Sequence, residues 1–181
     1  MNMPFFTKNA EVCSLNELNA LDSDVTHLTV SDHCGNEYES MPLYFTHFYN
    51  LREITIGNDC FIHVDQLNLT GLSRLQKVVI GMNSFTKKKN GFGMELNRRF
   101  YVRGCNALKE VRIGSYSFSD YSTAIIENNE LLEKIVIGEV NQLGYSFYSA
   151  SLQLGSGYCF IAMTHRLAEI AVHGDWKQCI S

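Results

Sequence analysis

The chain has 181 residues, of which 45% are hydrophobic and 19% are charged, and its net charge is −4. A chain of this length suits one domain with a sizeable buried core, and this composition excludes long disordered segments. The negative net charge gives no overall attraction to nucleic acid phosphates or to anionic membranes, so a basic site would have to be local.

Residues 1–24 are expected to form an N-terminal cap. Ser14 and Glu17 have the spacing of a capping box, and Leu18 and Leu21 follow them, so a short helix is predicted across the first repeat. The segment lacks the charged region and long apolar run of a secretory signal, and the sequence contains no apolar stretch of about 18 residues. We therefore expect a cytoplasmic protein without membrane contacts.

The cysteines and histidines give no pattern typical of a metal site. The six cysteines form no CxxC pair, and the six histidines form no HxxxH pair. We expect free, mostly buried thiols and no metal or other cofactor. The cysteines are Cys13, Cys34, Cys60, Cys105, Cys159 and Cys179.

A motif, LxxΦxΦGxxxF with Φ standing for Ile or Val, recurs along the middle of the chain. Its two Φ positions are two residues apart, so they lie on one face of a short strand. The glycine that follows is expected to adopt a positive φ, after which the phenylalanine returns to the interior. The copies start at Leu51, Leu75, Leu108 and Leu132, and the fourth reaches Phe147 only after extra residues.

A second apolar register lies between successive copies of this motif. Leu67 and Leu69 follow Phe61, and Ala124 and Ile126 take the same places after Phe118. Each repeat therefore carries two strand-like segments. The repeats are expected to cover residues 25–154, beginning with a weaker copy at Val25.

Stacked repeats of this length bury an apolar side that one repeat cannot bury alone. The motif resembles that of the irregular, BspA-like leucine-rich repeats, including the Ser-Phe pairs Ser84-Phe85 and Ser117-Phe118. Periodicity and resemblance together predict a single mainly β domain, a leucine-rich-repeat-like β-solenoid with coils of about 24 residues and short helical caps at its ends. The resemblance implies a binding surface without shared catalytic residues.

The third copy contains an insertion at about residues 86–94. Insertions in repeats map to loops on one face, and this one mixes basic with apolar side chains, as a surface for an acidic partner or for single-stranded nucleic acid would. The alternative is a solvated loop that folds back on its own apolar residues. The candidate binding residues of the insert are Lys87, Lys88, Lys89, Phe92, Met94, Arg98 and Arg99.

The outward positions of the first strand give a second candidate surface. One outward row alternates in charge and is expected to neutralise itself, because stacked strands place its members side by side. Its members are Glu53, Lys77, Glu110 and Lys134. The next outward row is partly apolar, and its candidate binding residues are Thr55, Val79, Arg112 and Val136.

The C-terminal end is expected to form a second cap, over residues 155–181. Leu152 and Leu154 make the last strand-like pair, and apolar residues at helical spacing then predict an amphipathic helix over residues 159–172. The polar side of this helix holds few basic residues, which favours a cap over a membrane-binding role.

No motif indicates catalysis, since the glycines are spaced by the repeat and are not clustered as in phosphate-binding loops. We therefore expect a non-catalytic protein–protein interaction module with a protein partner, not an enzyme. The alternative is a nucleic-acid-binding protein that uses the basic insert, residues 86–99. A third class, a hydrolase using His63 or His165, has no motif in its support.

Overall fold

The computed structural model describes residues 6–37, 40–87, 95–138, 145–148, 150–155 and 169–171, the last of these by their backbone only. They form two sheets and one short helix, α1 (Leu15–Asn19). The first sheet contains β1 (Asn9–Val12), β2 (His27–Val30), β4 (Glu53–Ile56), β6 (Lys77–Ile80), β8 (Glu110–Ile113), β10 (Lys134–Ile137) and β12 (Glu169–Ala171). The second contains β3 (Met41–Tyr44), β5 (Val64–Thr70), β7 (Glu95–Arg103), β9 (Tyr121–Glu127) and β11 (Ser151–Leu154).

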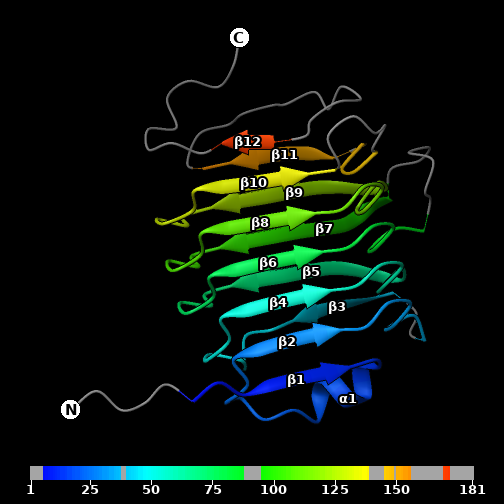
Figure 1. Cartoon of the computed structure of the whole chain (residues 1–181). Coiled ribbons are helices and arrows are strands. Elements are labelled where there is room, and N and C mark those ends of the chain that lie inside the picture. The colour runs from blue at the N-terminus through cyan, green and yellow to red at the C-terminus, as the bar shows by residue number, and fades with distance from the viewer. Residues whose placement is uncertain are drawn as a thin grey trace.

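Successive strands enter the two sheets alternately from β2 to β11, so each repeat adds one strand to each sheet (Figure 1). Paired strands run parallel, except that β12 is antiparallel to β10. The two sheets lie face to face as two layers (Figure 1).

This architecture corrects the predicted fold class. The described residues are mainly β, but they form two flat, stacked parallel sheets with almost no helix. The predicted leucine-rich-repeat-like β-solenoid with helical caps at both ends is therefore wrong. The physical reason lies in the second apolar register. Its side chains also alternate with a period of two residues, so it builds a complete sheet opposite the first.

The two predicted helical caps had different outcomes. The N-terminal helix is confirmed as α1, where the Glu17 N–H donates to Ser14 Oγ over 3.1 Å and the Cys13 N–H donates to Glu17 Oε2 over 2.7 Å. Within residues 159–172, however, the described part forms β12, which pairs with the edge of β10, and the remainder of that range lies outside the described residues. Among the described residues, no helix has the length and apolarity to cross a membrane.

The core lies between the sheets and consists of side chains stacked in ladders. On the first sheet, the register aligns Ile54 with Val78 and Ile56 with Ile80, and on the second it aligns Leu67 with Phe100. These side chains are at most 2% exposed, so the predicted inward positions are confirmed.

The phenylalanines after the first-sheet strands also return to the interior, as predicted. Phe61, Phe85, Phe118 and Phe147 are buried, and neighbouring rings have centroids 5.4, 4.8 and 5.0 Å apart. Their stacking ties together the successive repeats from Phe61 to Phe147.

The glycines before these phenylalanines have a different role from the predicted one. Gly57, Gly81 and Gly114 do not have a positive φ. A Cβ on Gly81 would lie 2.6 Å from the backbone of Gly57, and a Cβ on Gly114 would lie 2.5 Å from the backbone of Gly81. Glycine is needed at these three positions because successive turns touch. Gly138 does have a positive φ, and after each of the other glycines the positive φ falls two and four residues later, as at Asp59 and Phe61.

The expectation of free thiols is wrong for two cysteines. Cys13 and Cys34 form a disulfide with their Cα atoms 4.7 Å apart, because they occupy the same place in two consecutive turns. Cys60 and Cys105 are free and buried, as expected. Cys159 and Cys179 lie outside the described residues.

Candidate functional site

The partly apolar row predicted on the outer face of the first sheet is brought together by the strand register. Thr55 pairs with Val79, Val79 with Arg112, and Arg112 with Val136, each on the next strand. Thr55 and Arg112 are exposed, and the two valines are partly exposed. The row points outward because the residues on either side of each member belong to the core ladders. Thr29 on β2 extends the row toward the N-terminal end.

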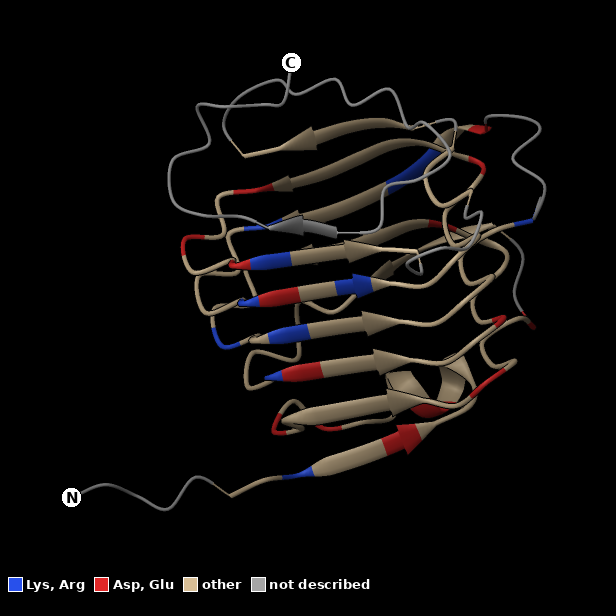
Figure 2. Ribbon diagram, turned by 45° about the horizontal axis from the view of Figure 1, so that its top comes forward, with Lys and Arg blue, Asp and Glu red and all other residues tan. Residues whose placement is uncertain are grey.

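The charged row beside it alternates in sign across β4, β6, β8 and β10, as Figure 2 shows. Lys77 Nζ lies 4.0 Å from Glu110 Oε2, and Arg112 Nε lies 2.7 Å from Glu110 Oε1. The predicted self-neutralising ladder is confirmed at the Lys77–Glu110 contact, and Arg112 of the neighbouring row adds a second pair to Glu110. Such exposed pairs contribute little stability, about 0.5 kcal/mol each.

A hollow of about 490 Å³ opens at the N-terminal end of this face, across β1, β2 and β4. Two carboxylates, Glu11 and Glu53, line it together with His27, whose Nε2 lies 4.0 Å from Glu53 Oε1. Glu11 accepts a hydrogen bond from Ser31 Oγ over 2.6 Å. The remaining lining residues are Asn9, Ala10, Leu28, Thr29 and Thr55. The hollow therefore offers hydrogen-bond acceptors and negative charge directly beside the partly apolar row.

Sequence reasoning missed this hollow because it assigned residues 1–24 to a cap and did not predict β1. The signal was present: Ala10 and Val12 alternate with Asn9 and Glu11, which is the pattern of a half-buried strand. Within the described residues, no group of three or more His, Cys, Asp or Glu side chains is placed to hold a metal ion. His63 is partly exposed, and His165 lies outside the described residues.

The described residues of the basic insert are spread over three environments. Lys87 Nζ lies 3.6 Å from Glu95 Oε2 and 3.8 Å from Asp65 Oδ1, so acidic side chains of this chain already neutralise it. Arg98 is fully buried, whereas Arg99 is exposed on the outer face of the second sheet. Lys88, Lys89, Phe92 and Met94 lie outside the described residues.

Arg98 belongs to a buried polar cluster at the start of β7. Its Nη1 donates to Asp120 Oδ2 over 2.9 Å, and its Nη2 donates to the carbonyl oxygens of Ile62 and Val64, each over 2.9 Å. The guanidinium lies 4.7 Å from the centroid of the Tyr121 ring, whose hydroxyl donates to the Val64 carbonyl. Arg98 thus fastens β7 to the preceding repeat.

Burial dominates the titration of this cluster. It raises the pKa of the Asp120 carboxyl, while the Arg98 guanidinium and the Lys87 backbone N–H oppose that shift. Burial also raises the pKa of Tyr121, so its hydroxyl stays protonated and remains a donor. Most polar atoms of these groups bond to one another or to backbone carbonyls, while Arg98 Nε and Asp120 Oδ1 are buried without a hydrogen-bond partner among the described residues. The contacts join side chains to the backbone of the preceding repeat, so the cluster holds the strands together.

Comparison of the chain with protein-family models, with curated proteins and with solved structures found no match.

Proposed function

We propose that this protein is a non-catalytic protein-binding module whose contact surface is the outer face of the first sheet. One observation carries the proposal: Thr29, Thr55, Val79, Arg112 and Val136 stand in one register row on a flat face. A flat surface that combines apolar side chains with an arginine and has a charged border is typical of protein interfaces.

The resemblance of the repeat motif to BspA-like sequences stays a hypothesis, and it supports a binding role. The nucleic-acid alternative has less support, because Lys87 and Arg98 form ion pairs within the chain.

The cytoplasmic location predicted from the sequence fits poorly with the Cys13–Cys34 disulfide, since cytosolic reductants keep most thiols reduced. We infer that the module works where disulfides persist.

Paired substitutions on the two outer faces test the proposal. Val79→Glu places a charge in the centre of the row on β6, and Ile125→Glu is its matched control on β9, because both residues are partly exposed, β-branched and outward-facing. A protein partner captured by the parent chain should bind Val79→Glu at least about tenfold more weakly and Ile125→Glu almost unchanged.

The opposite pattern would place the interface on the second sheet and contradict the proposal. Equal losses in both variants would indicate a change in folding, which circular dichroism spectra detect. Binding that falls steeply with salt and is lost only on changing Lys87 and Arg99 would favour the nucleic-acid alternative.

A further inference from the structure

One position in the turn after each first-sheet strand forms a ladder along the molecule. Each member accepts, at its backbone carbonyl, a hydrogen bond from the next turn. The donor is the N–H of the residue that directly follows the ladder position in that turn. The Gly35 N–H donates to the Cys13 carbonyl over 3.1 Å, the Phe61 N–H donates to the Cys34 carbonyl over 3.0 Å, and the Phe85 N–H donates to the Cys60 carbonyl over 2.9 Å. Three cysteines therefore occupy three successive levels of one ladder.

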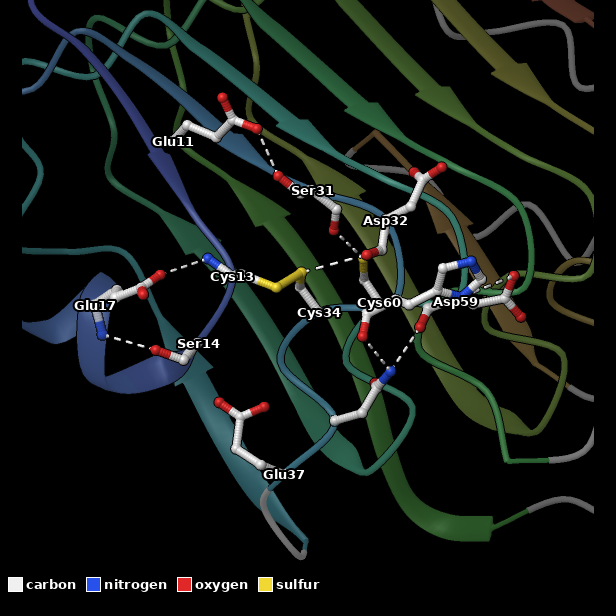
Figure 3. Close-up of a disulfide and its surroundings, with 12 residues drawn as sticks. Glu11, Cys13, Ser14, Glu17, Ser31, Asp32, Cys34, Glu37, Asp59 and Cys60 are labelled. Atoms are coloured by element: carbon white, nitrogen blue, oxygen red, sulfur yellow. Dashed lines mark hydrogen bonds and ion pairs between the residues drawn. A yellow bond between two sulfur atoms is a disulfide. The ribbon is translucent and has the colours of Figure 1, made fainter.

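Serines occupy the next levels and show how a side chain at this position is directed. Ser84 Oγ donates to the Gly57 carbonyl over 2.8 Å, and Ser117 Oγ donates to the Gly81 carbonyl over 2.6 Å. Cys60 Sγ makes the corresponding contact with the Ser31 carbonyl over 3.0 Å. The Cys60 thiol is thus held at the level directly beyond Cys34, as Figure 3 shows.

We propose that Cys13, Cys34 and Cys60 form a thiol–disulfide exchange site, in which the disulfide moves from Cys13–Cys34 to Cys34–Cys60. The Cys60 thiolate attacks Cys34 Sγ, the Cys34–Cys60 bond forms, and the Cys13–Cys34 bond breaks with Cys13 leaving as a thiolate. Cys60 loses its proton to water and Cys13 takes one up, so the step consumes no oxidant or reductant. Consecutive turns already place the Cys13 and Cys34 Cα atoms 4.7 Å apart, within the range that a disulfide spans, and the next level repeats this arrangement.

The exchange changes what holds the N-terminal end. Cys13 is exposed, whereas Cys34 and Cys60 are buried, so the released thiol is the one that solvent reaches. β1 then loses its covalent link to the next turn and is held by its hydrogen bonds to β2, the Ser31–Glu11 hydrogen bond, the buried side chain of Val12 and the packing of α1. β1 supplies Asn9, Ala10 and Glu11 to the lining of the hollow. The position of the disulfide therefore determines whether this part of the lining is covalently fixed to the next turn.

The rate should rise with pH, because only the thiolate attacks. Burial raises the pKa of the Cys60 thiol, and the nearby carboxylates of Asp32 and Asp59 act in the same direction, while backbone hydrogen bonds oppose them. His33 faces the same turn, with its Nδ1 3.9 Å from Asp59 Oδ2. Below the pKa of Cys60, each pH unit should speed the exchange about tenfold.

An alkylation trap tests the proposal in the full chain carrying Cys159→Ser and Cys179→Ser. The oxidised protein is incubated between about pH 7 and pH 9 with an alkylating reagent and without added thiol. Cleavage after glutamate separates the three cysteines, on residues 12–17, 18–37 and 54–95. We expect alkylated Cys13 together with a Cys34–Cys60 link, appearing faster at higher pH.

Cys60→Ser is the matched control, because serine occupies this ladder position naturally in the next repeats. It should slow the alkylation of Cys13 at least about tenfold, whereas Cys105→Ser should leave the rate unchanged. An intact Cys13–Cys34 link with Cys60 alkylated directly would overturn the proposal. Alkylation of Cys13 at the same rate in Cys60→Ser, or a link through Cys105, would overturn it as well.

A second variant removes the need for exchange. Cys13→Ser, with its fold checked by circular dichroism, should form a Cys34–Cys60 disulfide on mild oxidation if the two levels are aligned as we infer. Cys34 and Cys60 both remaining as free thiols would contradict that alignment. This outcome would not affect protein binding by the outer face, which the Val79→Glu variant tests separately.

Discussion

Two regions of the molecule attach one repeat to the next by different interactions. At the N-terminal end, a disulfide joins Cys13 to Cys34. At the start of β7, buried Arg98 joins Asp120 to the carbonyl oxygens of the preceding repeat. The disulfide acts largely by restricting the unfolded chain and depends on redox conditions, whereas the ionic cluster stabilises only while every partner is present. One end of the molecule can therefore respond to redox conditions while the centre does not.

The largest effect is expected from Arg98→Ala. This substitution leaves the Asp120 carboxyl buried without its charged partner, and breaking a buried pair in this way costs about 3–5 kcal/mol. Urea unfolding followed by circular dichroism measures the loss. Arg99→Ala is the matched control on the same strand, and because Arg99 is exposed it should change stability by less than about 0.5 kcal/mol. Similar losses in both variants would show that Arg98 is not buried as described.

A smaller effect is expected from removing the disulfide. The Cys13→Ser/Cys34→Ser variant loses a link between residues 21 positions apart, which should lower the free energy of unfolding by about 3 kcal/mol or somewhat less. Thermal melts with and without a reductant sharpen the comparison. The reductant should lower the melting temperature of the parent and of Arg98→Ala, but not that of the double serine variant. A parent chain that is insensitive to the reductant would argue against the disulfide.

The smallest effect is expected from Glu110→Gln on the outer face. Glu110 contacts both Lys77 and Arg112, but these side chains are partly exposed, so the loss should be only a few tenths of a kcal/mol. High salt should reduce the difference further, because it screens exposed charges. A loss as large as that of Arg98→Ala would mean that the charge ladder holds the sheet together.

The sequence was sufficient to predict the inward ladders and the outward rows, because a period of two residues directly reports which side chains face the core. Ile54, Ile56 and Leu67 lie where the pattern placed them. The same pattern could have identified Arg98, since it stands two residues before Phe100 and four before Val102 and so falls on the inward side of β7. Its charge instead led to its assignment to a binding loop.

Other features depend on contacts between turns, which the periodicity of one strand does not report. Within one turn, a positive φ is a sufficient reason for glycine, and the repeat pattern therefore predicted one. At Gly57, Gly81 and Gly114, glycine is needed instead because a Cβ would collide with the preceding turn. The disulfide was missed for a similar reason: Cys13 precedes the recognisable repeats, so its alignment with Cys34 appears only when β1 is placed beside β2. The C-terminal strand depends likewise on pairing, because the open edge of β10 favours a strand over the predicted helix.

The contact between successive glycine turns restricts how this chain can change in length. Gly81 packs against the backbone of Gly57, and Gly114 packs against that of Gly81, so every turn in this series presents the same surface to the next. Loss of a whole repeat would bring two equivalent turns together again, whereas loss of one residue inside a turn would push a side chain into the backbone below. Evolution can therefore lengthen or shorten this protein in whole repeats, or in segments placed away from the glycine contact, as the insertion before β7 illustrates.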